Sequence, residues 1–175
     1  NQKLLVEYGD RVQDRPHEWD ARWWSRIINA VHLAMRDRVA MIDLSAFAVF
    51  DLHGPGALEC IQKLTVAQMD VPPGRAVYTP LLNHRGGLKS DLTITRMTET
   101  SFRIVTGGSQ GGVDGKWFRD NLPSDGSAYL EDKTSALCTL GLWGPKARLL
   151  LQSITQDDVS NKGIPFGTAR NISIG

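Results

Sequence analysis

The sequence predicts an α+β protein built from short antiparallel strand pairs and separate helices. Two alternating apolar runs, 76–82 and 88–96, flank a Gly-Gly turn, as in a β-hairpin. Apolar residues recur at helical spacing within 26–39. A Gly-Pro pair that opens a helical pattern occurs twice, at 54–55 and at 144–145. These features predict strand and helix units that recur along the chain.

The composition excludes several classes of protein. The chain has 175 residues, 41% of them hydrophobic, which suffices for one compact domain or two small subdomains sharing a core. Its 20 Lys+Arg and 19 Asp+Glu are spread along the sequence, which argues against nucleic acid or a membrane surface as the main partner. No apolar run reaches the roughly 18 residues of a membrane span, and no signal peptide is apparent. We expect a cytoplasmic protein, or a mitochondrial-matrix protein if the source is eukaryotic.

Cysteine and histidine give no sign of a metal site. Cys60 and Cys138 lie in apolar runs without a partner at metal-ligand spacing, so we expect two buried free thiols. The four histidines share no metal-ligand spacing either, and surface or turn positions are expected for them. The sequence therefore predicts no bound metal.

The first part of the chain divides into an arm and a folded part. Residues 1–25 are polar and aromatic without a clean period, so we expect a short helix and then an arm packed on another surface. A helix is expected at 26–39, and the apolar segment 40–52 predicts one long bent strand or two short ones. After the break at 53–56, a helix is expected to end near Leu64.

The later elements follow from the same patterns. The hairpin strands 77–82 and 88–96 are followed by expected strands at 102–106, 128–132 and 136–143. Helices are expected at 113–122 and 147–154. The run 172–174 reads as a strand that needs a neighbour. Because the chain starts at Asn1 and stops just after this run, we expect a fragment of a longer polypeptide.

The two Gly-Pro segments indicate an internal repeat. Residues 53–65 (HGPGALECIQKLT) align with 143–155 (WGPKARLLLQSIT) at an offset of 90. The identical positions are Gly54, Pro55, Ala57, Gln62 and Thr65 with Gly144, Pro145, Ala147, Gln152 and Thr155. Each copy follows a strand-like run and precedes a helix. We therefore predict a duplicated strand and helix unit, and two related halves.

The glycine-rich run 107–112 has two readings. It lies between an expected strand and an expected helix, where a phosphate-binding loop would lie. Its glycine spacing matches neither a Walker loop nor a dinucleotide fingerprint. The favoured interpretation is a turn that lets the chain approach a neighbour closely.

Asp91 is the main candidate for chemistry. It lies inside the strand 88–96, on the polar side with Lys89 and Thr93 and opposite the apolar side of Leu92 and Ile94. A carboxylate in this place is most often simply solvated. If it faces a cleft, it can hold the N–H groups of a polar heterocycle or manage a proton at an amine.

Several motifs occur together in a fixed order. They are Ile42-Asp43-Leu44-Ser45, Gly54-Pro55-Gly56-Ala57, Gly74-Arg75-Ala76-Val77-Tyr78-Thr79, Asp91 and Gly144-Pro145-Lys146-Ala147. This order resembles the glycine-cleavage T-protein (aminomethyltransferase) superfamily. The runs SDLTITR and LGLWGPKAR, with the NQKLLVEYGD start, are similar to the folate-binding C-terminal region of flavin-dependent dimethylglycine and sarcosine dehydrogenases and oxidases.

The resemblance implies a fold and a reaction. The fold would be α+β with duplicated strand-helix subdomains of the T-protein folate-binding type, and residues 26–175 would be its N-terminal part. Such a domain binds tetrahydrofolate, which takes a one-carbon unit from a methylated-amine-derived donor to give 5,10-methylenetetrahydrofolate. FAD would belong to a separate flavin domain of the same polypeptide or of a partner subunit, and would not bind here.

The resemblance also implies site residues. Asp91 matches the key acid of the family, which anchors the pterin and stabilises positive charge at its reacting nitrogen. Tyr78 matches a residue that packs against or hydrogen-bonds the ring, and Val105 and Phe47 match positions that line the pterin. Two departures stand out, because Gly107 replaces a frequent Asn and Ser90 replaces the first acid of an Asp-Asp pair.

The leading hypothesis is therefore part of a tetrahydrofolate-dependent one-carbon transfer domain of a flavin-linked demethylating oxidoreductase. Because the chain stops before the second half of the family's folate pocket, we expect the isolated fragment to be inactive and a poor folate binder. The alternative is a non-catalytic regulatory or interaction module with the same fold.

Overall fold

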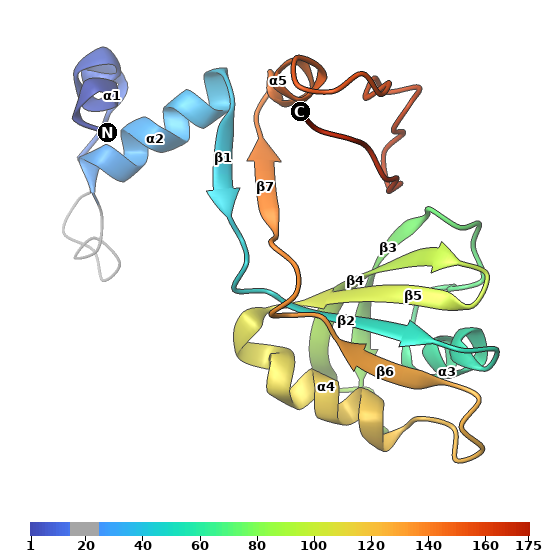
Figure 1. Cartoon of the computed structure of the whole chain (residues 1–175). Helices are drawn as coiled ribbons and strands as arrows, with labels where there is room; N and C mark the ends of the chain where they lie inside the picture. Colours follow the sequence, from blue (N-terminus) through green and yellow to red (C-terminus); the bar gives the residue numbers. More distant parts are fainter. Residues whose placement is uncertain (15–24) are drawn as a thin grey trace. The chain divides into compact units, whose positions relative to one another are not determined.

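A computed structural model of the protein describes residues 1–14 and 25–175 (Figure 1). The helices are α1 (Gln2–Glu7), α2 (Arg26–Asp37), α3 (Ala57–Leu64), α4 (Gly111–Asp120) and α5 (Ala147–Gln152). The strands are β1 (Ala40–Asp43), β2 (Ala48–His53), β3 (Ala76–Leu82), β4 (Leu88–Thr98), β5 (Ser101–Thr106), β6 (Tyr129–Asp132) and β7 (Leu140–Trp143). The chain forms two compact units. The first comprises Asn1–Ile42, Leu140–Val159 and Ser173–Gly175, and the second comprises Asp43–Thr139 and Ser160–Ile172.

The second unit is built on a five-stranded antiparallel sheet with the strand order β3-β4-β5-β2-β6. Burial alternates along β4 and β5, as expected for strands with one covered face. The covered face, here called the inner face, packs its apolar side chains against α3 and α4. This core includes Phe50, Leu52, Ile61, Leu81, Leu92, Ile94, Phe102, Ile104 and Phe118.

Helix α4 lies very close to β2 because its buried stripe contains glycine. A Cβ atom on Gly111 would meet Ala48 Cβ at 2.5 Å, and one on Gly115 would meet the Phe50 ring at 2.9 Å. A Cβ atom on Gly108, just before α4, would lie 1.9 Å from the Ala46 carbonyl oxygen. The glycine-rich run thus allows close backbone approach, in agreement with the favoured interpretation of the sequence.

The first unit contains the two-stranded sheet of β1 and β7 and a small helical core. Helix α1 packs on α2, with Tyr8, Val12, Ala30 and Ala34 buried between them. The guanidinium groups of Arg11 and Arg38 lie 5.3 and 5.6 Å from the Tyr8 ring centroid, where cation–π attraction supplements the burial of the ring. Residues 15–24 of the expected arm lie outside the described residues.

The two Gly-Pro turns have the same backbone geometry. Gly54 has φ of 119° and Gly144 has φ of 115°, a region that only glycine adopts readily. Each turn approaches a carbonyl group closely: an added Cβ would lie 2.3 Å from Ser127 O at Gly54 and 2.4 Å from Met35 O at Gly144. Two residues later, Gly56 N donates to Ser127 O, and Lys146 N donates to Arg38 O.

The helices that follow these turns end in matching side-chain contacts. Gln62 donates through Nε2 to Ala67 O and accepts from Met69 N, at 3.1 and 2.8 Å. Gln152 donates to Asp157 O and accepts from Val159 N, at 3.0 and 3.3 Å. All of these partners are 90 positions apart. We propose that the two segments descend from one duplicated unit, extending to Met69 and Val159.

Most expected elements are present. The segment 40–52 forms two short strands, which is one of the two expected arrangements, and these strands, β1 and β2, belong to different sheets. Two boundaries differ from the expectation. Only Leu140–Trp143 of the expected strand 136–143 is a strand, because Asp132 and Lys133 accept hydrogen bonds from Thr134 N and Ala136 N and turn the chain. Helix α4 begins two residues earlier than expected.

Two further expectations at the level of single residues were wrong. The run 172–174 forms no strand, since side chains bind its backbone: Thr155 Oγ1 donates to Ser173 O, and Asp157 Oδ2 accepts from Ser173 N. Both cysteines are free as expected, but only Cys60 is buried. Cys138 is exposed and lies 3.2 Å from Ser45 Oγ.

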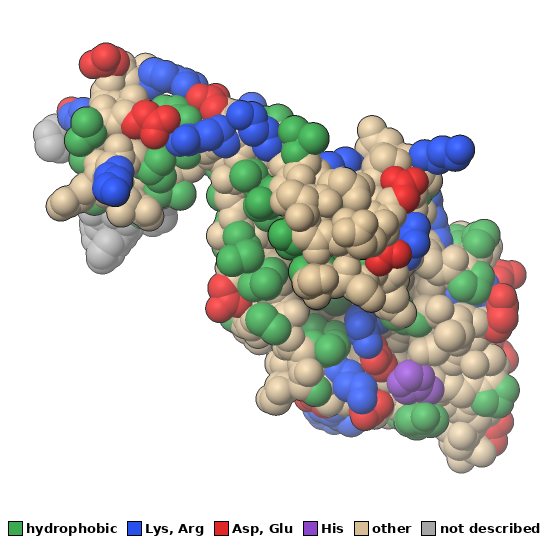
Figure 2. Space-filling view, turned by 45° about the horizontal axis from the view of Figure 1, so that its top comes forward, with side chains coloured by type: hydrophobic (Ala, Val, Ile, Leu, Met, Phe, Trp, Pro, Cys, Tyr) green, Lys and Arg blue, Asp and Glu red, His purple; other side chains and the backbone are tan. Residues whose placement is uncertain are grey.

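Within 1–14 and 25–175, no helix combines the length and the apolar character needed to cross a membrane. Charged side chains of both signs are interspersed over the face shown in Figure 2, as their spread along the sequence predicts.

The close approach of α4 can be tested with a pair of neighbouring glycines. Gly111→Ala should destabilise the fold by about 1–3 kcal/mol, because the new methyl group overlaps Ala48. Gly112→Ala has open space around it and should stabilise the helix by about 0.5–1 kcal/mol. Urea unfolding of both variants measures the difference. Equal effects of the two substitutions would contradict the close packing.

Candidate functional site

The face of the five-stranded sheet opposite α3 and α4, here called the outer face, carries the predicted site residues. The strand register places Tyr78 opposite Thr93, Thr93 opposite Val105, and Val105 opposite Val49. Directly paired residues share a face, so these four side chains form one row across β3, β4, β5 and β2. Asp91 lies two residues before Thr93 and therefore points to the same face.

Tyr78 and Asp91 are joined by a hydrogen bond. The Tyr78 hydroxyl donates to Asp91 Oδ2, which connects β3 to β4 across a diagonal of the hairpin. This bond raises the pKa of Tyr78, because the carboxylate favours the neutral, donating phenol; partial burial and the negative charge act in the same direction. Both side chains are exposed, with the Tyr78 residue 68% accessible. The pair therefore presents an aromatic ring and an acceptor oxygen to an incoming ligand.

Val105 and Phe47 differ in their relation to this pair. Val105 is half-buried within the row of Tyr78 and Thr93. Phe47 is half-buried and lies just before β2, outside the ladder, in a turn where Phe47 N donates to Leu44 O at 2.9 Å. The strand register thus places Tyr78, Asp91 and Val105 on the outer face, and it does not include Phe47.

A bidentate ion pair lies farther along the outer face. Arg103 of β5 donates to both carboxylate oxygens of Asp51 on β2, at 2.9 and 2.8 Å. The bond to Asp51 raises the pKa of Arg103 and fixes the guanidinium in a planar, bidentate pair. A cavity of about 270 Å³ lies beside it, with Thr95, Arg103, Arg170 and Asn171 among its lining residues.

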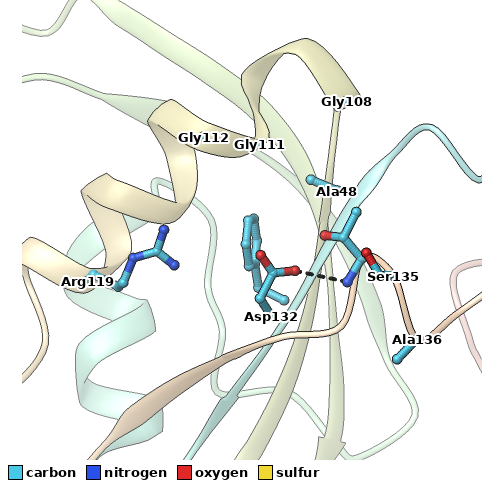
Figure 3. A pocket seen from close by; sticks show the side chains of 10 residues that line it. Ala48, Gly108, Gly111, Gly112, Arg119, Asp132, Ser135 and Ala136 are labelled. Carbon is cyan, nitrogen blue, oxygen red and sulfur yellow. Dashed lines mark hydrogen bonds between the residues drawn. The ribbon is translucent and has the colours of Figure 1, made fainter.

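A larger cavity, of about 530 Å³, lies on the inner side of the sheet beside α4 and β6. Figure 3 shows Arg119 and Asp132 on its walls and Gly108, Gly111 and Gly112 along the helix border. Asp132 accepts a hydrogen bond from Thr134 N at 2.9 Å, and the Thr134 side chain and backbone lower the pKa of this carboxyl, with a smaller effect of Arg119. This cavity is separate from Tyr78 and Asp91, which lie on the outer face.

The described residues contain no group of three or more His, Cys, Asp or Glu side chains that could hold a metal ion. The outer face offers groups that suit an uncharged heterocycle with N–H groups: a carboxylate that accepts hydrogen bonds, a phenol ring and an aliphatic side chain. Asp91 Oδ2 is engaged with Tyr78, and within the described part of the chain Oδ1 accepts no hydrogen bond. These residues therefore fit the pterin end of a folate in chemical type.

Sequence reasoning missed a buried polar cluster directly behind Asp91. Asp114 of α4 is fully buried and accepts hydrogen bonds from Ser90 and Thr106, two hydroxyl residues of the inner face. One signal was available: Asp114 lies four residues before the apolar Phe118, on the side of the expected helix that faces the core. An acid in that position marks a buried polar contact rather than a solvated surface.

Comparisons with known proteins show the family and the fold of the chain. The family described as the GCVT N-terminal domain matches residues 7–175. By structure, the chain resembles the crystal structure of glycine cleavage system aminomethyltransferase T from Bartonella henselae, with a TM-score of 0.67 and 22% identity, covering 86% of this chain and 42% of that one.

Three curated relatives are similar in sequence. The 4-methylaminobutanoate oxidase (formaldehyde-forming) of Paenarthrobacter nicotinovorans is 36% identical over 87% of this chain and 18% of its own length. The mitochondrial pyruvate dehydrogenase phosphatase regulatory subunit of Mus musculus is 31% identical over the same shares, 87% and 18%. The mitochondrial sarcosine dehydrogenase of Homo sapiens is 32% identical over 78% of this chain and 16% of its own length.

The likeness to the solved aminomethyltransferase shows that this α+β chain has the T-protein fold. The chain belongs to the glycine-cleavage T-protein superfamily, as the family match over 7–175 shows. The expected family and the expected fold class are thereby confirmed. The chain spans less than a fifth of the length of the oxidase and dehydrogenase relatives, and less than half of the solved aminomethyltransferase.

The hydrogen bond between Tyr78 and Asp91 predicts an alkaline signature. Asp91→Asn should lower the pKa of Tyr78 toward the ordinary value of about 10, because the charged acceptor is lost. Because the pKa of Tyr78 is higher in the folded state than in the unfolded state, the bond stabilises the fold below pH about 10. This contribution is lost as the pH rises through the folded-state pKa of Tyr78. Carbon-13 NMR of labelled tyrosine follows the titration, with Tyr78→Phe assigning the signal and Glu131→Gln as the control acid. If the pKa of Tyr78 is the same in Asp91→Asn as in the wild type, the hydrogen bond between Tyr78 and Asp91 is disproved.

Proposed function

We propose that this chain is part of a tetrahydrofolate-dependent one-carbon transfer domain of aminomethyltransferase type. Its parent would be a flavin-linked oxidoreductase that demethylates dimethylglycine, sarcosine or a related methylated amine, with 5,10-methylenetetrahydrofolate as the product. The observation that carries the proposal is the hydrogen-bonded Tyr78 and Asp91 pair on the outer face, next to Val105. Family membership and the names of the oxidase and dehydrogenase relatives support it.

In this proposal, Asp91 has two roles. Its Oδ1 accepts a hydrogen bond from a pterin N–H group. This bond anchors the pterin close to its reacting nitrogen and fixes the orientation of the ring. Tetrahydrofolate, when bound, supplies the amine nitrogen that takes up the one-carbon unit. The Asp91 carboxylate stabilises the positive charge that develops at that nitrogen and can accept a proton from it.

The neighbouring residues shape the same site. Tyr78 keeps Asp91 Oδ2 engaged through its hydroxyl and offers its exposed ring as a surface for the flat heterocycle. Val105 and Phe47 line the pterin with apolar surface. FAD is assigned to a separate domain of the parent polypeptide or to a partner subunit, and the outer-face residues take no part in holding it.

A second candidate function is a non-catalytic regulatory module. The similarity to a relative that is named a phosphatase regulatory subunit favours it. Gly107 and Ser90 stand where the resemblance implies an Asn and an Asp, and both departures are also compatible with this function. This alternative predicts the same fold without productive use of folate.

A titration with tetrahydrofolate separates the two functions. Calorimetry on the full-length polypeptide that contains this chain should detect binding, and Asp91→Asn should raise Kd about 10- to 100-fold, since a hydrogen bond to a charged group contributes about 1.5–3 kcal/mol. Tyr78→Phe keeps the ring and should have a smaller effect, below about tenfold. Asp120→Asn, whose carboxylate pairs with Lys116 on the exposed side of α4, is the matched control.

Formation of 5,10-methylenetetrahydrofolate from sarcosine or dimethylglycine completes the test. The yield should fall in Asp91→Asn and persist in Asp120→Asn. An absence of tetrahydrofolate binding in the full-length protein would refute the enzymatic proposal and favour the regulatory one. Unchanged product yield in Asp91→Asn would remove Asp91 from the mechanism.

A further inference from the structure

A fully buried carboxylate joins three elements behind Asp91. Asp114 of α4 has no exposed surface. Its Oδ2 accepts hydrogen bonds from Ser90 Oγ of β4 at 2.7 Å and from Thr106 Oγ1 of β5 at 2.6 Å. The two hydroxyl oxygens are 3.4 Å apart. One oxygen atom thus ties the ends of two neighbouring strands to the helix that covers them.

This cluster is poorly suited to stability alone. Asp114 Oδ1 is buried and has no hydrogen-bond partner, and no lysine or arginine of the described residues forms an ion pair with Asp114. A buried acceptor without a partner destabilises the fold, and apolar side chains of similar shape often pack as well or better. The cluster therefore calls for a role beyond holding the core together.

The strand that carries Asp91 is irregularly paired beside that residue. Asp91 lies opposite Pro80, whose ring nitrogen faces the open edge of β3 and not β4, as the outward N–H of Ala76 does. The register of β3 and β4 shifts between Leu81 and Leu82, one position farther on. On the other side, the ladder between β4 and β5 ends where Leu92 pairs with Thr106. Asp91 thus lies beyond the last residue pair between β4 and β5, and it lies close to the register shift between β3 and β4.

Ser90 is the point at which the cluster can act on Asp91. Adjacent residues of a strand point to opposite faces, so a shift or rotation of the backbone at Ser90 moves the Asp91 carboxylate on the outer face. The bond of Ser90 to Asp114 fixes β4 beyond its last pair with β5, and the bond of Thr106 ties the same acid to that last pair. Gly111 and Gly115 bring α4 close enough for these short bonds.

We propose that Asp114 is a positioning residue for Asp91, acting through Ser90 and Thr106 to hold the outer-face carboxylate where it meets Tyr78. Its importance for one-carbon transfer rests on the proposed function. The positioning itself can be measured without folate, because the hydrogen bond between Tyr78 and Asp91 reports it directly.

The Tyr78 phenol provides a readout that needs no folate. The chain has three tyrosines, so the carbon-13 signal of Tyr78 is assigned with Tyr78→Phe. Ser90→Ala and Thr106→Val each remove one hydroxyl without changing the charge of the cluster. In the double variant, the pKa of Tyr78 should fall by about half or more of the fall that Asp91→Asn produces, because the carboxylate is no longer held in place.

Two further variants separate positioning from general loosening. Asp114→Asn keeps an oxygen that accepts from both hydroxyls, so Tyr78 should keep most of its raised pKa. Ser101→Ala removes a hydroxyl that contacts His53 Nδ1 at 3.0 Å, at the opposite end of β5, and should leave Tyr78 unchanged. Urea unfolding of every variant shows which of them are folded.

The proposal fails if the folded double variant unfolds more easily while the Tyr78 pKa stays at its wild-type value. Asp114 would then serve the fold alone. If the double variant does not fold, the pKa of Tyr78 is measured in Ser90→Ala and in Thr106→Val separately. A wild-type pKa in both single variants would again refute the positioning role. If the full-length protein does not bind tetrahydrofolate, the proposed function is refuted. The positioning role of Asp114 is still decided by the Tyr78 pKa, because that measurement needs no folate.

Discussion

The antiparallel register of β4 with its two neighbours determines what each face of the sheet can do. Ser90 and Asp91 are adjacent, yet one bonds to a buried acid and the other meets Tyr78 on the outer face. A slip of one residue would turn Asp91 into the apolar core and Ser90 outward. Leu92 and Ile94, both nearly inaccessible, make such a slip costly. The packing of the core and the chemistry of the outer face therefore depend on the same strand pairing.

Local patterns predicted much of the fold. Helical spacing gave α2 and α3, and the alternation of 88–96 placed Asp91 on the polar side of its strand. Features that depend on distant partners were missed or wrong. The irregular run 172–174 follows from contacts with Thr155 and Asp157, and Cys138 is exposed although it lies in an apolar run. The cluster of Asp114 escaped notice because its two partners come from separate strands.

The relatives show how one domain can serve different proteins. An oxidase, a dehydrogenase and a regulatory subunit each share this domain over less than a fifth of their length. A common fold does not establish a common activity, which resides in particular side chains. In this chain, the side chains proposed to carry the activity include Tyr78, Asp91 and Val105, which lie on one face of one sheet.

Proline at position 80 lies on an edge strand, with its ring nitrogen on the open side. Strand β3 is the edge of its sheet, and short bridges from Thr65 to Leu81 and from Thr168 to Arg75 cover its two ends. The middle of the strand, around Tyr78, remains as a possible template for a strand from another molecule. Since Pro80 lacks a donor, this stretch cannot offer an unbroken row of hydrogen-bonding groups. The residue thus protects the protein against edge-to-edge aggregation beside its candidate site.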